Sequence, residues 1–374
     1  MIIGYDAKRI VRNGTGLGSY GRTLVNDLST HEELELRLYA PDMGVTQLRS
    51  QIVGRPNVSF CYPNKRTALG KALWRSHGIL RQLQHDGIQV YHGLSGELPR
   101  GISRAGIPSV VTIHDLIFLR HPEFYKSVDV RIYTNKFRQT LREADRIVAI
   151  SECTRRDICE LGHIDRSRIS LIYQSCGRQF AGEPEPKLLW QVRDRYNLPD
   201  RYVLSVGTIE PRKNVLLAVK ALQRLPDDVS LVIVGRPTPY ADEVQAYIDD
   251  ERLHPRVMML HDVPNEHLPA LYRMADTFVY PSRYEGFGIP VIEAIRMGLP
   301  VVAATGSCLE EAGGPDSLYV SPDDPEAMAH AISQTLYGAL GRERRIELSR
   351  QYIRRFENTG AAQQFAELYR EICC

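Results

Sequence analysis

Two glutamates, Glu285 and Glu293, bracket a Gly-Phe-Gly-Ile-Pro turn and form the most informative pattern in the chain. A short apolar segment, Thr277–Tyr280, leads into the turn, and a helix-like segment leaves it and ends at Gly298. Glycines at such a junction expose backbone N–H groups, and the positive end of the helix dipole points the same way. The combination suits a negatively charged, hydroxyl-rich ligand such as a sugar nucleotide. One glutamate alone would read as an ordinary helix start.

Arg212 and Lys213 are adjacent cations between a strand-like segment, Tyr202–Val206, and a helix-like segment, Val215–Leu225. Cations usually lie at helix C-termini, because the N-terminus is already positive. An anion held between the two side chains and the helix end would explain their position. Arginine can fork across two phosphate oxygens, whereas lysine supplies a point charge. The alternative interpretation is a pair of solvated surface cations.

A glycine-rich turn near the N-terminus is a third candidate. Gly16, Gly18 and Gly21 match the dinucleotide fingerprint G-x-G-x-x-G, which also asks for an acidic residue about 20 positions later. Asp42 comes late for that role. A nicotinamide-dependent oxidoreductase using Gly16–Gly21 therefore stays an alternative to a loop that serves one phosphate or an acceptor hydroxyl, or to a tight turn.

His114, followed by Asp115, comes directly after the apolar segment Ser109–Ile113. Ligand sites in parallel sheets lie at the carboxyl ends of strands, which is where this pair is expected. The side chain is either a structural histidine satisfied by the backbone or a contact to a sugar hydroxyl or the reacting centre.

Length and composition limit the classes of protein that remain. The 374 residues predict two domains, and 47 Lys and Arg against 45 Asp and Glu argue against a nucleic-acid partner bound through bulk charge. No apolar run approaches the roughly 18 residues that span a bilayer, and the N-terminus lacks the pattern of a signal peptide. Seven scattered cysteines without a Cys-x-x-Cys pair predict a reducing, cytoplasmic location.

Strand-like and helix-like segments alternate along the chain, which predicts an α/β fold with parallel sheets covered on both faces. Strands are expected at 2–5, 36–40, 58–61, 90–91, 109–113, 146–150 and 169–173, and again at 202–206, 231–234, 257–260, 277–280, 301–303 and 318–320. A helix is expected at about Tyr20–Leu28. The polar, Pro-rich stretch Ala181–Lys187 reads as a linker. We therefore expect two Rossmann-like domains, 1–180 and 190–355, that face a central cleft.

Residues 65–83 carry five cations, no acid and four leucines near helical spacing around Trp74. A basic amphipathic helix of this kind docks on anionic bilayers and would suit a lipid-linked acceptor at the inner face of the cell membrane. The alternative is an ordinary helix that packs its apolar stripe on the sheet.

Together these motifs resemble glycosyltransferase family 4, in particular bacterial mannosyltransferases of polysaccharide and O-antigen assembly. Glu285–Glu293 looks like the Glu-x7-Glu motif of retaining members, and Gly207–Asn214 is similar to the diphosphate motif. The loop 14–18, His114 and Ala149–Arg156 also fall in family order. Two segments differ from the usual pattern: Thr208 stands where many members carry Arg, and Ile172–Gly177 departs from Pro-Asn-Gly-Val.

The resemblance implies a GT-B fold in which the last helix, about 356–374, crosses back to an acceptor-binding N-terminal domain. It implies that Glu293 binds the ribose hydroxyls and that Arg212 and Lys213 neutralise the diphosphate. It further implies that Gly16 approaches the distal phosphate and that His114 touches the sugar. The remaining implied contacts, to the donor sugar, come from Glu285 and the amides of Gly286, Phe287, Gly288 and Ile289.

The implied reaction is a retaining transfer of a hexose, mannose- or rhamnose-type, from a GDP-sugar rather than a UDP-sugar to a glycan or lipid-linked acceptor. The chain has no Asp-x-Asp, so we expect it to need neither a metal nor a cofactor. A non-catalytic protein that binds sugar nucleotides is a further alternative. Intact Glu285, Glu293 and Lys213 argue against it.

Overall fold

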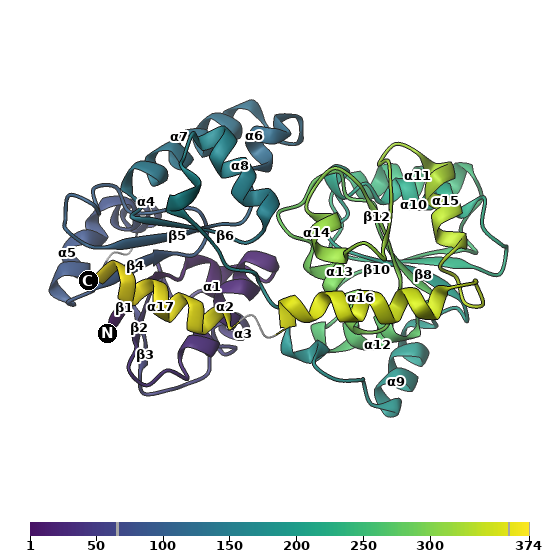
Figure 1. The fold of residues 1–374 in the computed structure, drawn as a ribbon, viewed down its shortest axis with the longest axis horizontal. Helices are drawn as coiled ribbons and strands as arrows, with labels where there is room; N and C mark the ends of the chain where they lie inside the picture. The colour runs from purple at the N-terminus through teal and green to yellow at the C-terminus, as the bar shows by residue number, and fades with distance from the viewer. Residues whose placement is uncertain (65–66, 358–359, 374) are drawn as a thin grey trace. The chain divides into compact units, whose positions relative to one another are not determined.

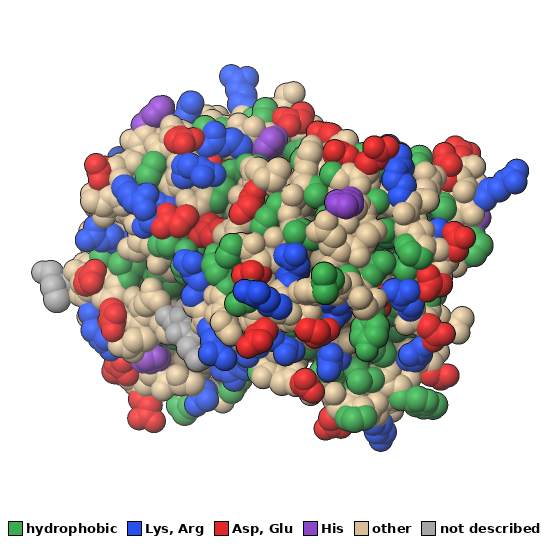
Figure 2. Space-filling view, turned by 45° about the vertical axis from the view of Figure 1, so that its right-hand side comes forward, with side chains coloured by type: hydrophobic (Ala, Val, Ile, Leu, Met, Phe, Trp, Pro, Cys, Tyr) green, Lys and Arg blue, Asp and Glu red, His purple; other side chains and the backbone are tan. Residues whose placement is uncertain are grey.

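A computed structural model of the chain describes residues 1–64, 67–357 and 360–373, and it contains two compact α/β units (Figure 1). The first unit comprises Met1–Gln174 with Thr359–Cys374, and the second comprises Ser175–Asn358. Acidic and basic side chains intermingle on the face that Figure 2 shows, in keeping with a formal charge of +2.

The first unit is built on a seven-stranded sheet in the order β3-β2-β1-β4-β5-β6-β7, with every neighbouring pair parallel. Its order reverses between β1 and β4, and β4 and β5 are buried along their whole length. The strands are β1 (Ile2–Asp6), β2 (Glu35–Tyr39), β3 (Val58–Cys61), β4 (Val90–Gly93), β5 (Ser109–Ile113), β6 (Arg146–Ala149) and β7 (Ile169–Leu171).

The second unit repeats this plan with a six-stranded parallel sheet in the order β10-β9-β8-β11-β12-β13, which reverses between β8 and β11. The strands are β8 (Tyr202–Val206), β9 (Ser230–Val234), β10 (Val257–Leu260), β11 (Thr277–Tyr280), β12 (Val301–Ala304) and β13 (Leu318–Val320). Helices cover both faces of each sheet (Figure 1), so the predicted pair of Rossmann-like domains is confirmed.

The helices of the first unit are α1 (Lys8–Arg12), α2 (Gly16–Leu28), α3 (Thr46–Arg49), α4 (Ala68–Leu73), α5 (Ile79–His85), α6 (Ile117–Arg120), α7 (Ser127–Glu143), α8 (Glu152–Gly162) and α17 (Ala361–Cys373). Those of the second unit are α9 (Pro186–Tyr196), α10 (Val215–Leu222), α11 (Tyr240–Asp250), α12 (Leu268–Met274), α13 (Ile289–Arg296), α14 (Leu309–Gly313), α15 (Pro325–Ser333) and α16 (Arg342–Glu357).

Helix α2 begins earlier than the sequence pattern indicates, at Gly16 instead of Tyr20. The Thr15 carbonyl accepts from the N–H groups of Gly18 and Ser19, so the glycine-rich stretch forms the first helical turn. A Cβ on Gly18 would lie 1.8 Å from the Asn13 carbonyl oxygen. Gly18 is therefore required because the preceding loop packs directly on the helix.

The C-terminal helix α17 belongs to the first unit, where it packs against α2 and β4 (Figure 1). Phe365 and Tyr369 are fully buried in the first unit's core, and the Tyr369 hydroxyl lies 2.7 Å from His92 Nδ1. The expected return of the last helix to the N-terminal domain is confirmed. It is separate from α16, whereas one helix over about 356–374 was expected.

The division between the units falls at residues 174 and 175, ahead of the stretch Ala181–Lys187 that was expected to be a linker. Phe180 is fully buried, and its ring meets that of Tyr272 edge to face at 5.7 Å. Pro186 then begins α9. The stretch thus follows a buried residue of the second unit and leads into a helix of the same unit, to which it belongs.

The described part of the basic segment 65–83 lies in one uninterrupted helical stretch with a π-helical turn inside it; residues 65 and 66 lie outside the described residues. From Ala68 the chain forms α4, a π-helical turn at Trp74–Gly78, and α5. Trp74, Ile79 and Leu83 are buried, whereas Leu69 and Leu73 are 70% and 57% exposed. Part of the stripe therefore packs on the sheet, as the alternative interpretation predicts, and α4 presents apolar side chains outward. Within the residues that the structure describes, we find no helix with the length and apolarity that crossing a bilayer requires.

Candidate functional site

Three of the residues predicted in the second unit, Arg212, Lys213 and Glu285, meet at the reversal point of its sheet, where ligands of α/β proteins bind. Strand β8 leads to Arg212 and Lys213, and the neighbouring strand β11 leads to Glu285. The Asn214 amide donates to the carbonyl oxygens of Pro281 and Pro322, at 3.2 and 2.8 Å. This side chain fastens the two loops to each other and sets the position of both cations.

Glu285 is the centre of this cluster. Its Oε1 atom lies 2.5 Å from Lys213 Nζ and 2.9 Å from Arg212 Nη1, and it also accepts from the Ser282 hydroxyl. Burial alone would raise the pKa of Glu285, but the charges of Lys213 and Arg212 outweigh burial and lower the pKa to about 2. Glu285 is thus ionised at every physiological pH, and it holds the Lys213 ammonium and the Arg212 guanidinium group in one place.

Arg212 has further partners that hold its guanidinium group. It donates to the Tyr284 carbonyl at 2.7 Å and to Glu210 at 2.6 Å. Two cations and two carboxylates therefore balance in this cluster before any ligand arrives. Glu285, which was expected to hold the donor sugar, also positions the two cations.

Tyr280 also contacts Lys213, through two parts of its side chain. Its hydroxyl accepts from Lys213 Nζ at 2.5 Å, and the ammonium lies 4.9 Å from the ring centroid. Tyr280→Phe keeps the ring and removes the hydroxyl, so we expect kcat/KM for transfer to fall roughly tenfold. Steady-state kinetics would measure the loss. Tyr247→Phe is the matched control, because its ring holds Lys220 in the same way elsewhere, at 5.5 Å. Equal activity of the two variants would contradict the prediction.

Glu293 lies on the first turns of α13, away from the two cations. The Tyr272 hydroxyl donates to its Oε2 atom at 3.1 Å. Burial raises the pKa of Glu293 to about 7, and Tyr272 lowers it only in part. The two glutamates therefore differ chemically: Glu285 is a permanent anion, whereas Glu293 is poised to titrate near neutral pH.

The turn between them, Gly286–Ile289, delivers the chain into α13. Gly288 precedes the helix with φ 103°, so the helix start carries a glycine that offers no side chain as a cap. The backbone N–H groups at the start of α13 and the dipole of this helix favour a negatively charged group at its N-terminus.

Gly288→Ala should destabilise the chain by about 1–2 kcal/mol from backbone strain alone. An added Cβ would also meet Leu309 Cδ2 at 2.9 Å, which raises the cost further. Gly306→Ala is the control, because Gly306 has a similar φ of 95° and open space around its Cβ position. Urea unfolding should show the larger loss for Gly288→Ala, and a smaller loss would mean that contact with Leu309 is unimportant.

Gly16 and His114 belong to the first unit. Gly16 is exposed, and nothing lies within 4 Å of the position its Cβ would take, so packing does not explain this glycine as it explains Gly18. Asp42, the acidic residue considered for the dinucleotide fingerprint, pairs with two cations of the first unit. Its carboxylate lies 3.0 Å from Arg12 Nε and 2.9 Å from Lys71 Nζ.

His114 uses both ring nitrogens in contacts with the protein. Nε2 lies 2.9 Å from the Leu94 carbonyl oxygen and Nδ1 lies 3.0 Å from the Gln174 amide nitrogen. The carbonyl can only accept, so Nε2 carries the proton and Nδ1 accepts. Burial lowers the pKa of His114 to about 4, against a smaller opposite effect of the Leu94 carbonyl. A neutral, oriented imidazole suits a positioning or contact role better than proton transfer.

Sequence reasoning missed Tyr280, Ser282, Tyr272 and Gln174, which hold the predicted residues in place. Of these, Tyr280 and Ser282 lie in the same stretch of sequence as Glu285, whereas Tyr272 and Gln174 belong to other segments. No group of three or more His, Cys, Asp or Glu side chains suited to a metal ion occurs in 1–64, 67–357 and 360–373. The roles of the individual residues stay predictions.

Comparison with known proteins agrees with this fold. Residues 15–175 match the description Glycosyltransferase Family 4, and residues 190–352 match Glycosyl transferases group 1. The O-antigen chain mannosyltransferase B of Escherichia coli is 30% identical over 350 residues, which cover 88% of this chain and 89% of that protein. The nicotinamide alternative finds no support among these matches.

Two further similarities are informative. The GDP-mannose-dependent alpha-(1-6)-phosphatidylinositol monomannoside mannosyltransferase of Mycolicibacterium smegmatis is 33% identical over 167 residues, covering 41% of this chain and 43% of that protein. The structure of sucrose-phosphate synthase from Thermosynechococcus elongatus is similar with a TM-score of 0.78 at 19% identity, over 100% of this chain and 99% of that one. The latter shows the GT-B fold alone. With both halves matched and a relative similar along nearly its whole length, the chain belongs to glycosyltransferase family 4.

Proposed function

We propose that this glycosyltransferase moves a hexose, mannose or a mannose-like sugar, from a GDP-sugar to a glycan or lipid-linked acceptor with retention of anomeric configuration. The observation that carries the proposal is the cluster of Lys213, Arg212 and Glu285 at the reversal point of the second sheet. The name of the Escherichia coli relative supports mannose, and that of the Mycolicibacterium smegmatis relative supports GDP.

In the proposed reaction the bond between the anomeric carbon and the phosphate oxygen breaks, and the acceptor oxygen bonds to the same carbon on the same face. Negative charge develops on the departing diphosphate, where Lys213 and Arg212 stabilise it. The acceptor proton passes to a phosphate oxygen of the leaving group, which completes the balance. The proposal uses no metal ion and no cofactor.

Other residues hold the donor. Glu293 would accept hydrogen bonds from the ribose hydroxyls, and Glu285 would orient the cations and contact the sugar. The backbone of 286–289 would add N–H donors. Gly16 would let the backbone approach the distal phosphate, and neutral His114 would touch the sugar. We place the reaction in the cytoplasm, with peripheral contact to the inner face of the membrane.

A thermal-shift panel of GDP, UDP, ADP and their sugars tests the donor, because a ligand that binds only the folded chain raises its midpoint of unfolding. We expect the largest shift with GDP and GDP-mannose. A larger shift with UDP would overturn the choice of base. Release of GDP from GDP-mannose separates an enzyme from a non-catalytic binding protein.

Transfer of mannose to a lipid-linked or glycan acceptor, followed by NMR of the new anomeric centre, tests the stereochemistry. An inverted product would contradict the proposal. The same transfer assay in the presence of EDTA tests whether the reaction is independent of metal ions. Loss of transfer with EDTA would contradict metal independence and leave the rest of the proposal intact.

A further inference from the structure

A network of polar side chains lies in the core of the first unit, between its sheet and the helices α2 and α17. This core network consists of Tyr5 of β1, Tyr20 of α2, His92 of β4, Thr112 of β5 and Tyr369 of α17. All of them except Tyr20 are fully buried. Apolar side chains would fill the same space with no polar group to satisfy, because buried polar groups cost free energy unless each has a partner. A buried network whose members are paired fixes one arrangement of the elements that it joins.

The hydrogen bonds of the core network run in one direction from β1 to β5. The Tyr5 hydroxyl donates to the Tyr369 hydroxyl at 3.2 Å, and the Tyr369 hydroxyl donates in turn to His92 Nδ1 at 2.7 Å. Burial, and then the charge of His114, lower the pKa of His92 to about 3, so this imidazole is neutral and carries its proton on Nε2. His92 Nε2 donates to Thr112 Oγ1 at 2.8 Å.

Tyr20 joins the core network to His114. Its hydroxyl lies 3.3 Å from Thr112 Oγ1, and its ring meets the His114 imidazole edge to face, with 4.7 Å between the ring centroids. Thr112 and His114 are alternate residues and point to the same side, where Tyr20 contacts both. The ring contact is a third restraint on the imidazole, whose two nitrogens are held by the Leu94 carbonyl and the Gln174 amide.

Both places where the chain passes between the two units lead to side chains that hold His114. The first unit ends at Gln174, and the chain returns to it at residue 359, shortly before α17. Gln174 contacts His114 directly, whereas Tyr369 of α17 reaches it through the core network. The position of the His114 ring therefore depends on how α17 is docked.

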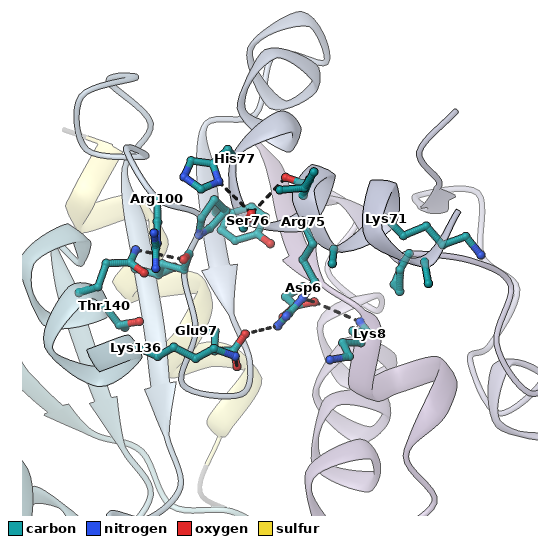
Figure 3. Close-up of a pocket in the computed structure, with 18 of the residues that line it drawn as sticks. Asp6, Lys8, Lys71, Arg75, Ser76, His77, Glu97, Arg100, Lys136 and Thr140 are labelled. Carbon is teal, nitrogen blue, oxygen red and sulfur yellow. Dashed lines mark hydrogen bonds and ion pairs between the residues drawn. The ribbon is translucent and has the colours of Figure 1, made fainter. Parts of the chain in front are cut away.

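The core network is separate from the cavity of about 750 Å³ in the first unit (Figure 3). Asp6 and Tyr91 line that cavity, and they directly follow Tyr5 on β1 and precede His92 on β4. Successive side chains of a strand point to opposite faces, so the network and the cavity lie on opposite faces of these strands. In the cavity Asp6 pairs with Arg75 at 2.6 Å (Figure 3), and substitutions in the core network leave this ion pair in place.

We propose that Tyr369, His92 and Thr112 are positioning residues for His114 in the transfer reaction. Acting through Tyr20, they hold the imidazole in the orientation in which it contacts the donor sugar. The docking of α17 is then required for recognition of the sugar as well as for the stability of the first unit. The inference rests on the proposed function, because that function gives His114 a sugar to contact.

Tyr369→Phe tests the proposal, because it removes the hydroxyl that donates to His92 and keeps the ring in the core. Calorimetry should show the affinity for GDP-mannose falling roughly three- to tenfold, about the worth of one hydrogen bond or aromatic contact. The affinity for GDP should be unchanged, since GDP has no sugar for His114 to contact. Tyr5→Phe is the matched control. It removes an equally buried hydroxyl that lies beyond Tyr369, and both affinities should stay at the parent values.

Thr112 offers a second pair of variants, which decides the proposal if Tyr369→Phe does not fold. Thr112→Val has nearly the same shape and no hydroxyl, so it should lose affinity for GDP-mannose and keep affinity for GDP. Thr112→Ser keeps the hydroxyl and should restore most of the affinity for GDP-mannose. Thermal unfolding verifies that each variant is folded.

NMR of the imidazole nitrogens, with isotope-labelled histidine, follows the core network without any ligand. The signals of His92 and His114 are assigned from His92→Asn and His114→Asn. Both signals should change in Tyr369→Phe and stay in place in Tyr5→Phe. An unchanged His114 signal in Tyr369→Phe would overturn the proposal.

Two results of the calorimetry would also overturn it. One is an equal loss of affinity for GDP-mannose in Tyr369→Phe and Tyr5→Phe, and the other is an equal loss for GDP and GDP-mannose in Tyr369→Phe. Failure of the parent chain to bind GDP or GDP-mannose would instead contradict the proposed function. The NMR comparison would then still decide whether the core network positions His114.

Discussion

Lys213→Ala should lower kcat/KM for hexosyl transfer by on the order of 10²–10³, the usual cost of removing one group that stabilises developing charge. The ammonium sits 2.5 Å from both Glu285 and the Tyr280 hydroxyl, so it is held in place before a donor binds. Preorganised charge of this kind costs no rearrangement during the reaction. Steady-state transfer kinetics with GDP-mannose would measure the loss.

The structure also predicts how this variant fails. Glu285 keeps Arg212 and Ser282 as partners after Lys213 is removed, so the chain should stay folded. The loss should fall mainly on kcat, because the charge to be stabilised grows in the transition state. Lys220→Ala on α10 removes a lysine that also rests on a tyrosine ring, and it should be nearly silent. Full activity of Lys213→Ala would refute the assignment of the diphosphate site.

Glu293→Gln should make the chain more stable at alkaline pH. With a pKa of about 7 against an ordinary 4.5, the folded chain retains a proton that the unfolded chain releases between these values. The unfolded state then binds fewer protons, so stability falls as pH rises from about 4.5 to about 7 and stays lower above it. Glutamine has no proton to lose. At pH 8 we expect a gain of roughly 2–3 kcal/mol, because the half-buried carboxylate keeps part of its hydration.

Thermal unfolding of Glu293→Gln and the parent at pH 4.5 and pH 8 checks the sign of the effect. At pH 4.5 the difference between their free energies of unfolding should shrink to roughly a few tenths of a kcal/mol. Glu347→Gln, an exposed glutamate on α16, is the control and should show no pH-dependent gain. A variant that is no more stable than the parent at pH 8 would mean that ionising the half-buried Glu293 carboxylate carries no penalty.

The same substitution should weaken GDP binding. A carboxylate accepts hydrogen bonds from both ribose hydroxyls, whereas an amide offers one acceptor oxygen and two donors. Calorimetry should show the parent chain binding GDP more tightly at pH 8 than at pH 6, as Glu293 ionises, and this trend should disappear in Glu293→Gln. Persistence of the trend would remove Glu293 from the ribose site. Glu293→Gln would thus raise the stability of the chain at alkaline pH and lower its affinity for GDP.

The strands could be located from the sequence because buried parallel strands carry near-continuous apolar runs. Tyr202–Val206 and Thr277–Tyr280 have the bounds that the pattern predicts. The alternation of strand-like and helix-like segments does not predict the order of the strands within a sheet. Lys213 and Glu285 are 72 residues apart and meet only because β8 and β11 are neighbours.

Side-chain environments were harder to predict than elements. The pattern around Trp74 indicated one amphipathic helix, but a π-helical turn rotates the stripe, so Ile79 and Leu83 are buried while Leu69 and Leu73 face outward. Glu285 and Glu293 look equivalent in sequence, yet one lies against two cations and the other beside a tyrosine hydroxyl. Their ionisation depends on these neighbours, which the linear pattern does not specify.

The docking of α17 on the first unit also has a consequence for biosynthesis. Residues 361–373 leave the ribosome after the whole of the second unit, yet Phe365 and Tyr369 complete the core around β1 and β4. The unit that is translated first therefore finishes folding last, and until then it exposes the apolar surface that α17 covers. During synthesis this surface is the part of the chain most in need of chaperone protection.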